Sequence, residues 1–326
     1  MGVSHLFSLV RELVPELMQR VSFLSLKGKR VAIELSSLMY RMAYSRTSSK
    51  DESFLLSILD LHDALRLMCP RVLFVFDADR TPDAVEATVR DKKLVNMKKH
   101  FQRLFEAKQG TQYKRIVESD NRITAHYFVR LRKLMDTFDV EYIVAPLGIE
   151  AEWLAVQYQH HNEIDVVITT DSDSIACGSP CVFTQTPQLA VCCKLAGFFV
   201  RKMKNGTPVA FDIALESCKE ENKCVCMSAL SVCSSFKISM GQLVHACVMS
   251  GTDHWPSGFK NIGMHKAIEL MREHNTIQNW ISSVRDKRSC TSLEQAALDL
   301  YDAYKIQTAL IAFAPNEAVY RYCISF

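Results

Sequence analysis

The sequence contains little glycine and proline, with 11 and 9 of them among its 326 residues. This composition excludes a collagen-like or low-complexity chain. Long apolar runs are also missing, because the longest, such as Ala309 to Pro315, fall far short of the ~20 residues that a membrane-spanning helix needs. Charged side chains at Arg11, Glu12 and Glu16 interrupt the first apolar stretch, which excludes a secretory signal peptide. We therefore expect a non-secreted, intracellular protein.

Several catalytic signatures are absent. The sequence has no phosphate-binding loop GxxxxGK[ST], no dinucleotide-binding GxGxxG, no zinc-protease HExxH and no hydrolase GxSxG. It does have 12 cysteines, seven of them within residues 181–233, but none of those seven forms a CxxC pair. Reduced thiols are the preferred interpretation in an intracellular protein, and a structural zinc site is the alternative.

Four apolar runs rich in valine and isoleucine predict strands buried on both faces. They are Arg30–Leu35, Arg71–Phe76, Val140–Ala145 and Asp165–Thr169. Helical spacing of apolar residues lies between them, at Phe54–Met68, Ala125–Phe138 and Ala151–His160. Strands that alternate with helices predict an α/β fold with a mostly parallel central sheet flanked by helices.

The C-terminal third has a helical pattern without a strand signal. The predicted helices are Met240–Ser250, Met264–His274 and Ser292–Ala314. Residues 186–236 mix glycine, proline, cysteine and charge, and this composition favours a loop or hairpin insertion.

Positive charge is concentrated in one segment. Residues 90–133 contain 13 Lys and Arg side chains against four acids, a net charge of +9 in a chain whose total is +3. A basic helical segment beside an acidic remainder is typical of enzymes that act on nucleic acid. A solvated helical surface is the alternative.

Carboxylates follow the predicted strands. In chain order they are Glu34, Asp77, Glu150, Glu152, Asp171 and Asp173. Because the carboxyl ends of parallel strands open onto one crevice, we expect these side chains to meet there. Each close pair of carboxylates in such a place costs on the order of a few kcal/mol unless cations neutralise it.

Ligands that are all oxygen favour Mg²⁺ or Mn²⁺ over zinc. Two such ions about 4 Å apart assist the in-line attack of water on a phosphodiester. For any single pair the alternative is a cap or surface role, since Glu150 and Glu152 would also suit a helix N-terminus.

Seven segments resemble, in order, the motifs of the flap endonuclease / XPG-type structure-specific 5′-nucleases. The first are MGVSHL at residue 1, KRVAIELSSLMY at 29–40 and FVFDAD at 74–79. The middle ones are APLGIEAEWLAV at 145–156 and TTDSDSIACGSP at 169–180. The last are SGTDHW at 250–255 and NIGMHKAIEL at 261–270. Some are weak alone, but the ordered set is specific.

The resemblance implies a PIN-like nuclease fold with a helical arch and a C-terminal helix–hairpin–helix. It implies a nuclease that cuts branched DNA, such as 5′ flaps, near the junction of single strand and duplex, in replication, repair or recombination. Motif by motif, it assigns two Mg²⁺ or Mn²⁺ ions to Glu34, Asp77, Glu150, Glu152, Asp171, Asp173 and Asp253. It assigns the scissile phosphate to Arg90, Lys92 and Lys93.

The same resemblance implies DNA contacts. Gly2 would lie near the active site, and Tyr40 would stack on a base. The helix–hairpin–helix at 241–272 would hold the duplex backbone through main-chain groups, with a K⁺ ion among its carbonyls. The remaining DNA contacts are assigned to Lys98, Lys99, Arg103, Arg130, Lys133, Gly263, His265 and Lys266.

The sequence departs from the family pattern in several places. Glu34 replaces an aspartate, Asn261 a glycine and Met264 a proline, and Asp83 and Ala84 occupy the region of a family lysine. These departures keep open a catalytically weak member that only binds nucleic acid. Within the family, a 5′–3′ exonuclease, a junction resolvase and an RNA nuclease stay open, so RNA remains a candidate partner.

Two further expectations concern partners and source. Gln307, Leu310 and Phe313 resemble a sliding-clamp motif only faintly, and the core of a helix is the preferred interpretation. The divergence of the motifs suits a viral member, acting in the nucleus or at a cytoplasmic replication site.

We expect one nuclease domain over residues 1–326. Its parts would be an N-terminal nuclease region at 1–89, the basic arch at 90–133, an internal nuclease region with the cysteine-rich insertion at 134–237, and the helix–hairpin–helix with C-terminal helices at 238–326.

Overall fold

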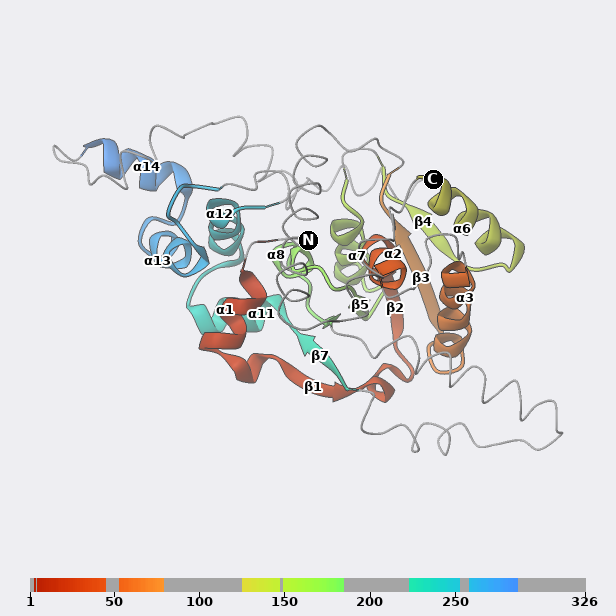
Figure 1. Ribbon diagram of the computed structural model, residues 1–326. Coiled ribbons are helices and arrows are strands. Elements are labelled where there is room, and N and C mark those ends of the chain that lie inside the picture. The colour runs from red at the N-terminus through yellow and green to blue at the C-terminus, as the bar shows by residue number, and fades with distance from the viewer. Residues whose placement is uncertain are drawn as a thin grey trace, which may run out of the picture.

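The computed structural model describes residues 3, 5–44, 53–78, 125–146, 149–184, 223–252 and 258–286. Within these ranges the chain forms a seven-stranded sheet in the order β1-β7-β6-β5-β2-β3-β4, with helices on both faces (Figure 1). The strands are β1 (Gln19–Ser22), β2 (Arg30–Glu34), β3 (Arg71–Phe76), β4 (Tyr142–Val144), β5 (Val166–Ile168), β6 (Val182–Thr184) and β7 (Lys223–Met227).

The described helices precede, separate and follow these strands. The first are α1 (Leu6–Leu13), α2 (Leu35–Tyr44), α3 (Ser53–Arg66), α6 (Ala125–Thr137), α7 (Ala151–His160) and the short α8 (Asp173–Ala176). The last are α11 (Ala229–Phe236), α12 (Met240–Ser250), α13 (Met264–His274) and α14 (Ile277–Asp286). Short 3₁₀ turns occupy Pro15–Leu17 and Phe23–Leu26. None of these helices is both long enough and apolar enough to cross a bilayer.

The mostly parallel sheet predicted from the sequence is confirmed. Strands β6, β5, β2, β3 and β4 run parallel, whereas β7 is antiparallel to both β6 and β1. All four predicted strands are present. Strands β1, β6 and β7 and helix α11 were not predicted. Three of the four β1 residues are exposed, so β1 lacks the apolar alternation that marks a strand.

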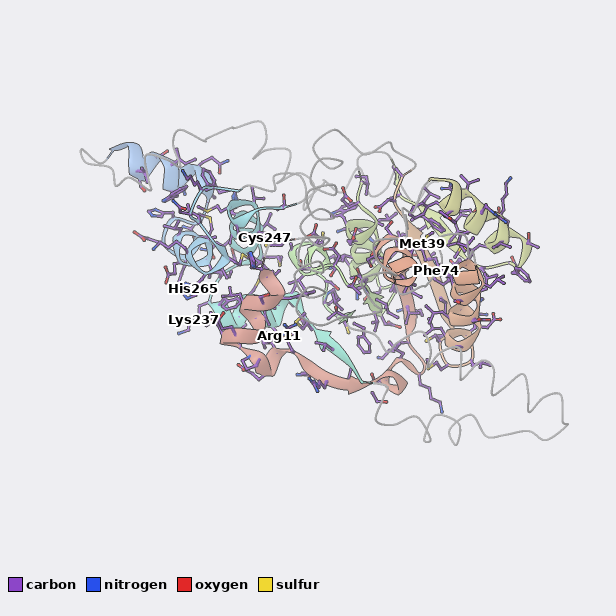
Figure 2. The ribbon with its side chains drawn as sticks, in the orientation of Figure 1. Arg11, Met39, Phe74, Lys237, Cys247 and His265 are labelled. Atoms are coloured by element: carbon purple, nitrogen blue, oxygen red, sulfur yellow. The ribbon has the colours of Figure 1, made fainter. Side chains whose placement is uncertain are left out.

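The central strands alternate their side chains between two cores. In β2, Val31 and Ile33 pack into the core under α2, α3 and α6, while Ala32 faces α7. Met39 of α2 and Phe74 of β3 lie in the first of these cores, where Figure 2 labels them close together. The small side chain of Ala32 lets α7 lie close to the sheet.

A third core holds the helical C-terminal part together, and it includes residues of α1, α8 and α11 to α14. Helix α12 begins with a capping box, in which the Ser239 hydroxyl accepts from the Gln242 amide at 3.2 Å and Gln242 Oε1 accepts from the Ser239 amide at 2.7 Å. The Gln242 side chain also donates to the Met271 carbonyl at 2.8 Å, which ties α12 to α13.

Gly258 lies between these two helices with a φ of +48°, and a Cβ there would lie 2.4 Å from the Met249 carbonyl oxygen. Only glycine fits that approach. The two helices of the predicted helix–hairpin–helix are present as α12 and α13, side by side in Figure 1, and residues 253–257 between them lie outside the described residues. Of the predicted arch at 90–133, residues 90–124 lie outside the described residues and residues 125–133 belong to α6; the predicted helix Ser292–Ala314 also lies outside them.

Candidate metal centre

Six carboxylates predicted from the sequence follow the carboxyl ends of the parallel strands. Glu34 ends β2, Asp77 follows β3, and Asp171 and Asp173 follow β5. Glu150 is the N-cap of α7, and Glu152 lies in its first turn. Parallel pairing of β2 with both β3 and β5 places these ends at the same edge of the sheet.

The tightest group consists of Asp77, Glu150 and Glu152. Each offers a carboxylate oxygen, and the three oxygens lie within 4.8 Å of one another. Glu152 is buried, and the other two are half-buried. A set of only carboxylate oxygens at this spacing fits a hard divalent cation such as Mg²⁺ or Mn²⁺. Among the residues that the structure describes, no group of three possible ligands includes a cysteine.

Asp77 is held from two sides. Its Oδ2 accepts a 2.6 Å hydrogen bond from the Ser36 hydroxyl on α2. Its Oδ1 accepts from the backbone amide of Ala151 at 3.0 Å, at the first turn of α7. Asp77 therefore caps α7 from β3, while the Glu150 side chain makes no cap hydrogen bond. This arrangement leaves the Glu150 carboxylate directed to the group of three rather than to its own helix.

Glu34 lies outside that group of three. Its side chain turns back on its own helix, where Oε1 and Oε2 accept from the Ser37 amide at 2.9 and 3.2 Å. Oε2 also accepts from the Thr169 hydroxyl at 3.1 Å. Glu34 thus caps α2 and connects β2 with the end of β5. Only 1% of its surface is exposed, and burial, then the charge of Asp77, raises its pKa to about 7.

The pKa of Glu152 depends on the acids around it. Burial raises its pKa well above the ordinary range, and the negative charges of Glu34, Asp77, Asp171 and Glu150 raise it further. These five carboxyls therefore form one electrostatic unit. An excess of negative charge among buried and half-buried carboxyls favours binding of a cation or protonation of some of them.

Asp171 and Asp173 lie on the loop after β5. Thr169 accepts a 3.0 Å hydrogen bond from the Asp171 amide, so its hydroxyl connects Glu34 with Asp171. Asp171 Oδ1 accepts from the Asp173 amide at 3.2 Å. Asp173 Oδ1 in turn accepts from the Val3 amide at 2.6 Å, which places the N-terminal segment beside the acids.

Other predicted site residues fall into three groups. Tyr40 lies in α2, and Arg130 and Lys133 are exposed on α6. Gly263 is the N-cap of α13, and its first turn carries His265 and Lys266, both of which pair with Glu269. The predicted residues outside the described ranges are Gly2, Arg90, Lys92, Lys93, Lys98, Lys99, Arg103 and Asp253.

The sequence reasoning missed Ser36 and Thr169, the two hydroxyls that hold the acids. The only available signal was their position: Ser36 is two residues after Glu34, and Thr169 is two residues before Asp171. Serine and threonine are common in such turns, so this signal is weak.

Comparison with known proteins gives a consistent result. Residues 139–253 match the XPG I-region family model. Flap endonuclease 1-A of Sorghum bicolor is 21% identical over 88% of this chain and 70% of its own length. The catalytic core of Rad2 in complex with DNA substrate is similar in fold, with a TM-score of 0.60 and 17% identity over 97% of this chain and 86% of that one. Human GEN1 in complex with Holliday junction DNA has a TM-score of 0.55 and 16% identity, over 98% and 66% of the two chains.

Proposed function

We propose that this chain, which belongs to the XPG-type flap endonuclease family, is a metal-dependent, structure-specific 5′-nuclease that cuts branched DNA next to a junction of single strand and duplex. The observation that carries the proposal is the group of Asp77, Glu150 and Glu152 with their oxygens within 4.8 Å. The pKa of buried Glu152, raised by burial and by its acidic neighbours, supports a site built for cations.

Asp77, Glu150 and Glu152 would hold one divalent ion, and Asp171 and Asp173 a second. When bound, such ions supply hydroxide from water at neutral pH and stabilise the charge that develops on the phosphate. The protein contributes orientation: Ser36 and the Ala151 amide fix Asp77, and Thr169 connects Glu34 with the Asp171 loop. Such supporting hydrogen bonds keep the ligands in place while substrate binds.

The substrate would be held by groups that read the backbone rather than the bases. The N-terminus of α13 presents main-chain amides at Gly263 with Lys266 in the first turn, an arrangement that suits a phosphate. The basic segment 90–133 would supply further phosphate contacts, including Arg90, Lys92 and Lys93. Tyr40 would stack on a base, and a K⁺ ion would join the hairpin between α12 and α13.

Two substrate classes compete within this proposal. The likeness to flap endonucleases favours 5′ flaps, and the likeness of the fold to GEN1, described with Holliday junction DNA, supports four-way junctions as a second candidate. Single-stranded 5′ ends and RNA are further candidate substrates, and the cleavage assay below includes both. The alternative outside the nucleases is a catalytically weak family member that only binds DNA.

The test is cleavage of end-labelled single-stranded, duplex, 5′-flap and four-way-junction DNA and one RNA, each with Mg²⁺ and with EDTA. We expect Mg²⁺-dependent incision at the base of the flap. Cutting confined to the junction, the free end or RNA would select that class instead. DNA binding without any cleavage, in a protein that binds Mg²⁺ by calorimetry, would overturn the nuclease proposal.

A further inference from the structure

Cys181 and Cys226 bring two thiols together away from the acids. Their sulfur atoms lie 3.7 Å apart. Cys181 directly precedes β6, and Cys226 lies in the antiparallel strand β7 opposite Phe183. Since side chains alternate along a strand, Cys181, Phe183 and Cys226 share one face of the sheet, and all three border the core under α2 and α3. Both cysteines are half-buried.

The backbone around each cysteine is fixed by hydrogen bonds. The Cys181 carbonyl accepts from the Val167 amide at 3.1 Å and from Gln159 Nε2 at 2.8 Å. Cys226 lies in a strand that is paired on both sides, because β7 pairs with β6 on one side and with the edge strand β1, at Gln19, on the other. A disulfide needs the two sulfurs to approach by about 1.7 Å, to a bond of about 2.05 Å. Cys226 pairs with Phe183, so Cys181, two residues earlier in the chain, is its diagonal neighbour, and closure requires rotation of both side chains.

The reactivity of the described cysteines also singles out this pair. The hydrogen bond with Cys181 lowers the pKa of Cys226 below that of an ordinary thiol. Burial raises the pKa of four other described thiols, which are Cys69, Cys177, Cys233 and Cys247. Because the thiolate is the nucleophile, the lowered pKa favours Cys226, among these described cysteines, as the one that attacks an external disulfide.

We propose that Cys181 and Cys226 are a modification site that closes to a reversible disulfide by exchange with a low-molecular-weight disulfide such as oxidised glutathione. The Cys226 thiolate attacks one sulfur of the reagent and releases one thiolate. The Cys181 thiolate then attacks Cys226 of the mixed disulfide and releases the second. The two protons of the protein thiols pass to the two released thiolates, so two protein thiols are oxidised and one reagent disulfide is reduced to two thiols.

The new bond would connect residues that are 45 apart in sequence. It constrains the unfolded chain, and for a loop of this length we expect the melting temperature to rise by about 5 °C. The pair lies at the amino end of β6, whereas the acids follow the carboxyl ends of the strands parallel to it. The modification therefore stands independently of the proposed nuclease activity, and its test needs none.

The experiment treats the folded, reduced protein with oxidised glutathione, alkylates the remaining thiols and maps disulfides by mass spectrometry after digestion. We expect one linkage between the peptides of Cys181 and Cys226, reversed by dithiothreitol, and the accompanying rise in melting temperature. Cys181→Ser should keep a glutathione adduct on Cys226 and lose the rise. Cys233→Ser, a buried thiol outside the pair that contacts Met240, is the matched control and should close like the wild type.

Three results would overturn the proposal in the wild-type protein alone, so it does not depend on how the variants fold. They are a linkage of either cysteine to a different partner, a stable glutathione adduct on Cys226 without closure, and failure of both thiols to react.

Discussion

The two edges of the parallel sheet arrange their charges in opposite ways. At the amino ends of the strands, acids lie opposite arginines. Arg30 Nη2 is 2.7 Å from Asp165 Oδ1, and Arg71 Nη2 is 2.7 Å from Glu141 Oε1. The hydrogen bonds from Arg30 lower the pKa of Asp165, so this carboxylate is more stable as an anion than in water.

At the carboxyl ends, acids lie beside acids. Burial and neighbouring negative charge raise the pKa of Glu34 to about 7 and that of Glu152 well above its ordinary range. The contrast separates acids that are paired within the protein from the acids of the proposed metal site. At the amino ends of the strands, arginines within the protein neutralise the acids. At the carboxyl ends, the acids repel one another, and a divalent cation would relieve that repulsion.

The largest expected effect comes from one aspartate at each end of β5. Asp171→Ala should lower kcat for flap cleavage by about three orders of magnitude, because metal ions stabilise the transition state by several kcal/mol. DNA binding, measured by fluorescence anisotropy, should change little. Asp165→Ala at the opposite end of the strand is the matched control and should keep kcat near the wild-type value.

Equal loss of activity in both aspartate variants would mean that general destabilisation, rather than the site, explains the effect. Retained cleavage by Asp171→Ala would exclude Asp171 from the metal site and weaken the assignment of its loop.

A smaller effect is expected from Thr169, whose hydroxyl contacts both Glu34 and the Asp171 amide. Thr169→Val keeps the shape and removes the hydroxyl, and it should weaken Mg²⁺ binding by about 10- to 100-fold, as loss of a supporting hydrogen bond does at metal sites. Isothermal titration calorimetry measures this without catalysis. Thr169→Ser restores the hydroxyl and should recover most of the affinity; if it binds as weakly as the valine variant, packing rather than the hydrogen bond is responsible.

The stored repulsion predicts a pH dependence of stability. Because the pKa of Glu34 is about 7 in the folded protein against 4.5 for an ordinary glutamate, the folded state binds a proton that the unfolded state has lost between these pH values. In the metal-free protein, the stabilisation that comes from protonated Glu34 is therefore complete below about pH 4.5 and lost as pH rises through 7. Mg²⁺ should raise the melting temperature more at pH 8 than at pH 5, because at pH 5 the ion must compete with that proton.

Thermal unfolding with EDTA, Mg²⁺ or K⁺ at several pH values measures this dependence. Glu34→Gln carries no titrating group and should flatten the metal-free profile between pH 4.5 and 7. An unchanged profile in that variant would assign the dependence to other groups of the crevice.

The sequence predicted the acids at the carboxyl ends of the strands better than the hydrogen bonds that hold them. Strands such as Arg71–Phe76 are apolar on both faces, and an acid after such a strand is a strong signal, so the positions of Asp77 and Asp171 followed from general rules of parallel sheets. The orientation of Glu34 could not be predicted, since nothing in the chain order shows that its longer side chain reaches the Ser37 amide and the Thr169 hydroxyl.

The antiparallel edge of the sheet was missed for a different reason. Strand β1 is largely exposed and lacks the continuous apolar run of a buried strand. The apolar run of β7 is short and follows the charged segment Lys219 to Lys223, a composition that favoured a loop or hairpin. The pairing of the two strands is a long-range contact between residues about 200 apart, such as Val21 and Cys224, and local periodicity carries no information about it.

The smallest expected effect is that of Asp165→Ala on stability, and its pH dependence differs from that of Glu34. Asp165→Ala removes a half-exposed ion pair, so it should cost only about 0.5–1 kcal/mol of unfolding free energy at pH 7 in urea denaturation. The pKa of Asp165 is lowered from 3.8, and its contribution is therefore present above that value and lost as pH falls through the folded-state pKa. The difference between wild type and variant should be constant from pH 7 to 5, where the Glu34 contribution changes. A difference that instead varies across this range would show that the two edges are coupled.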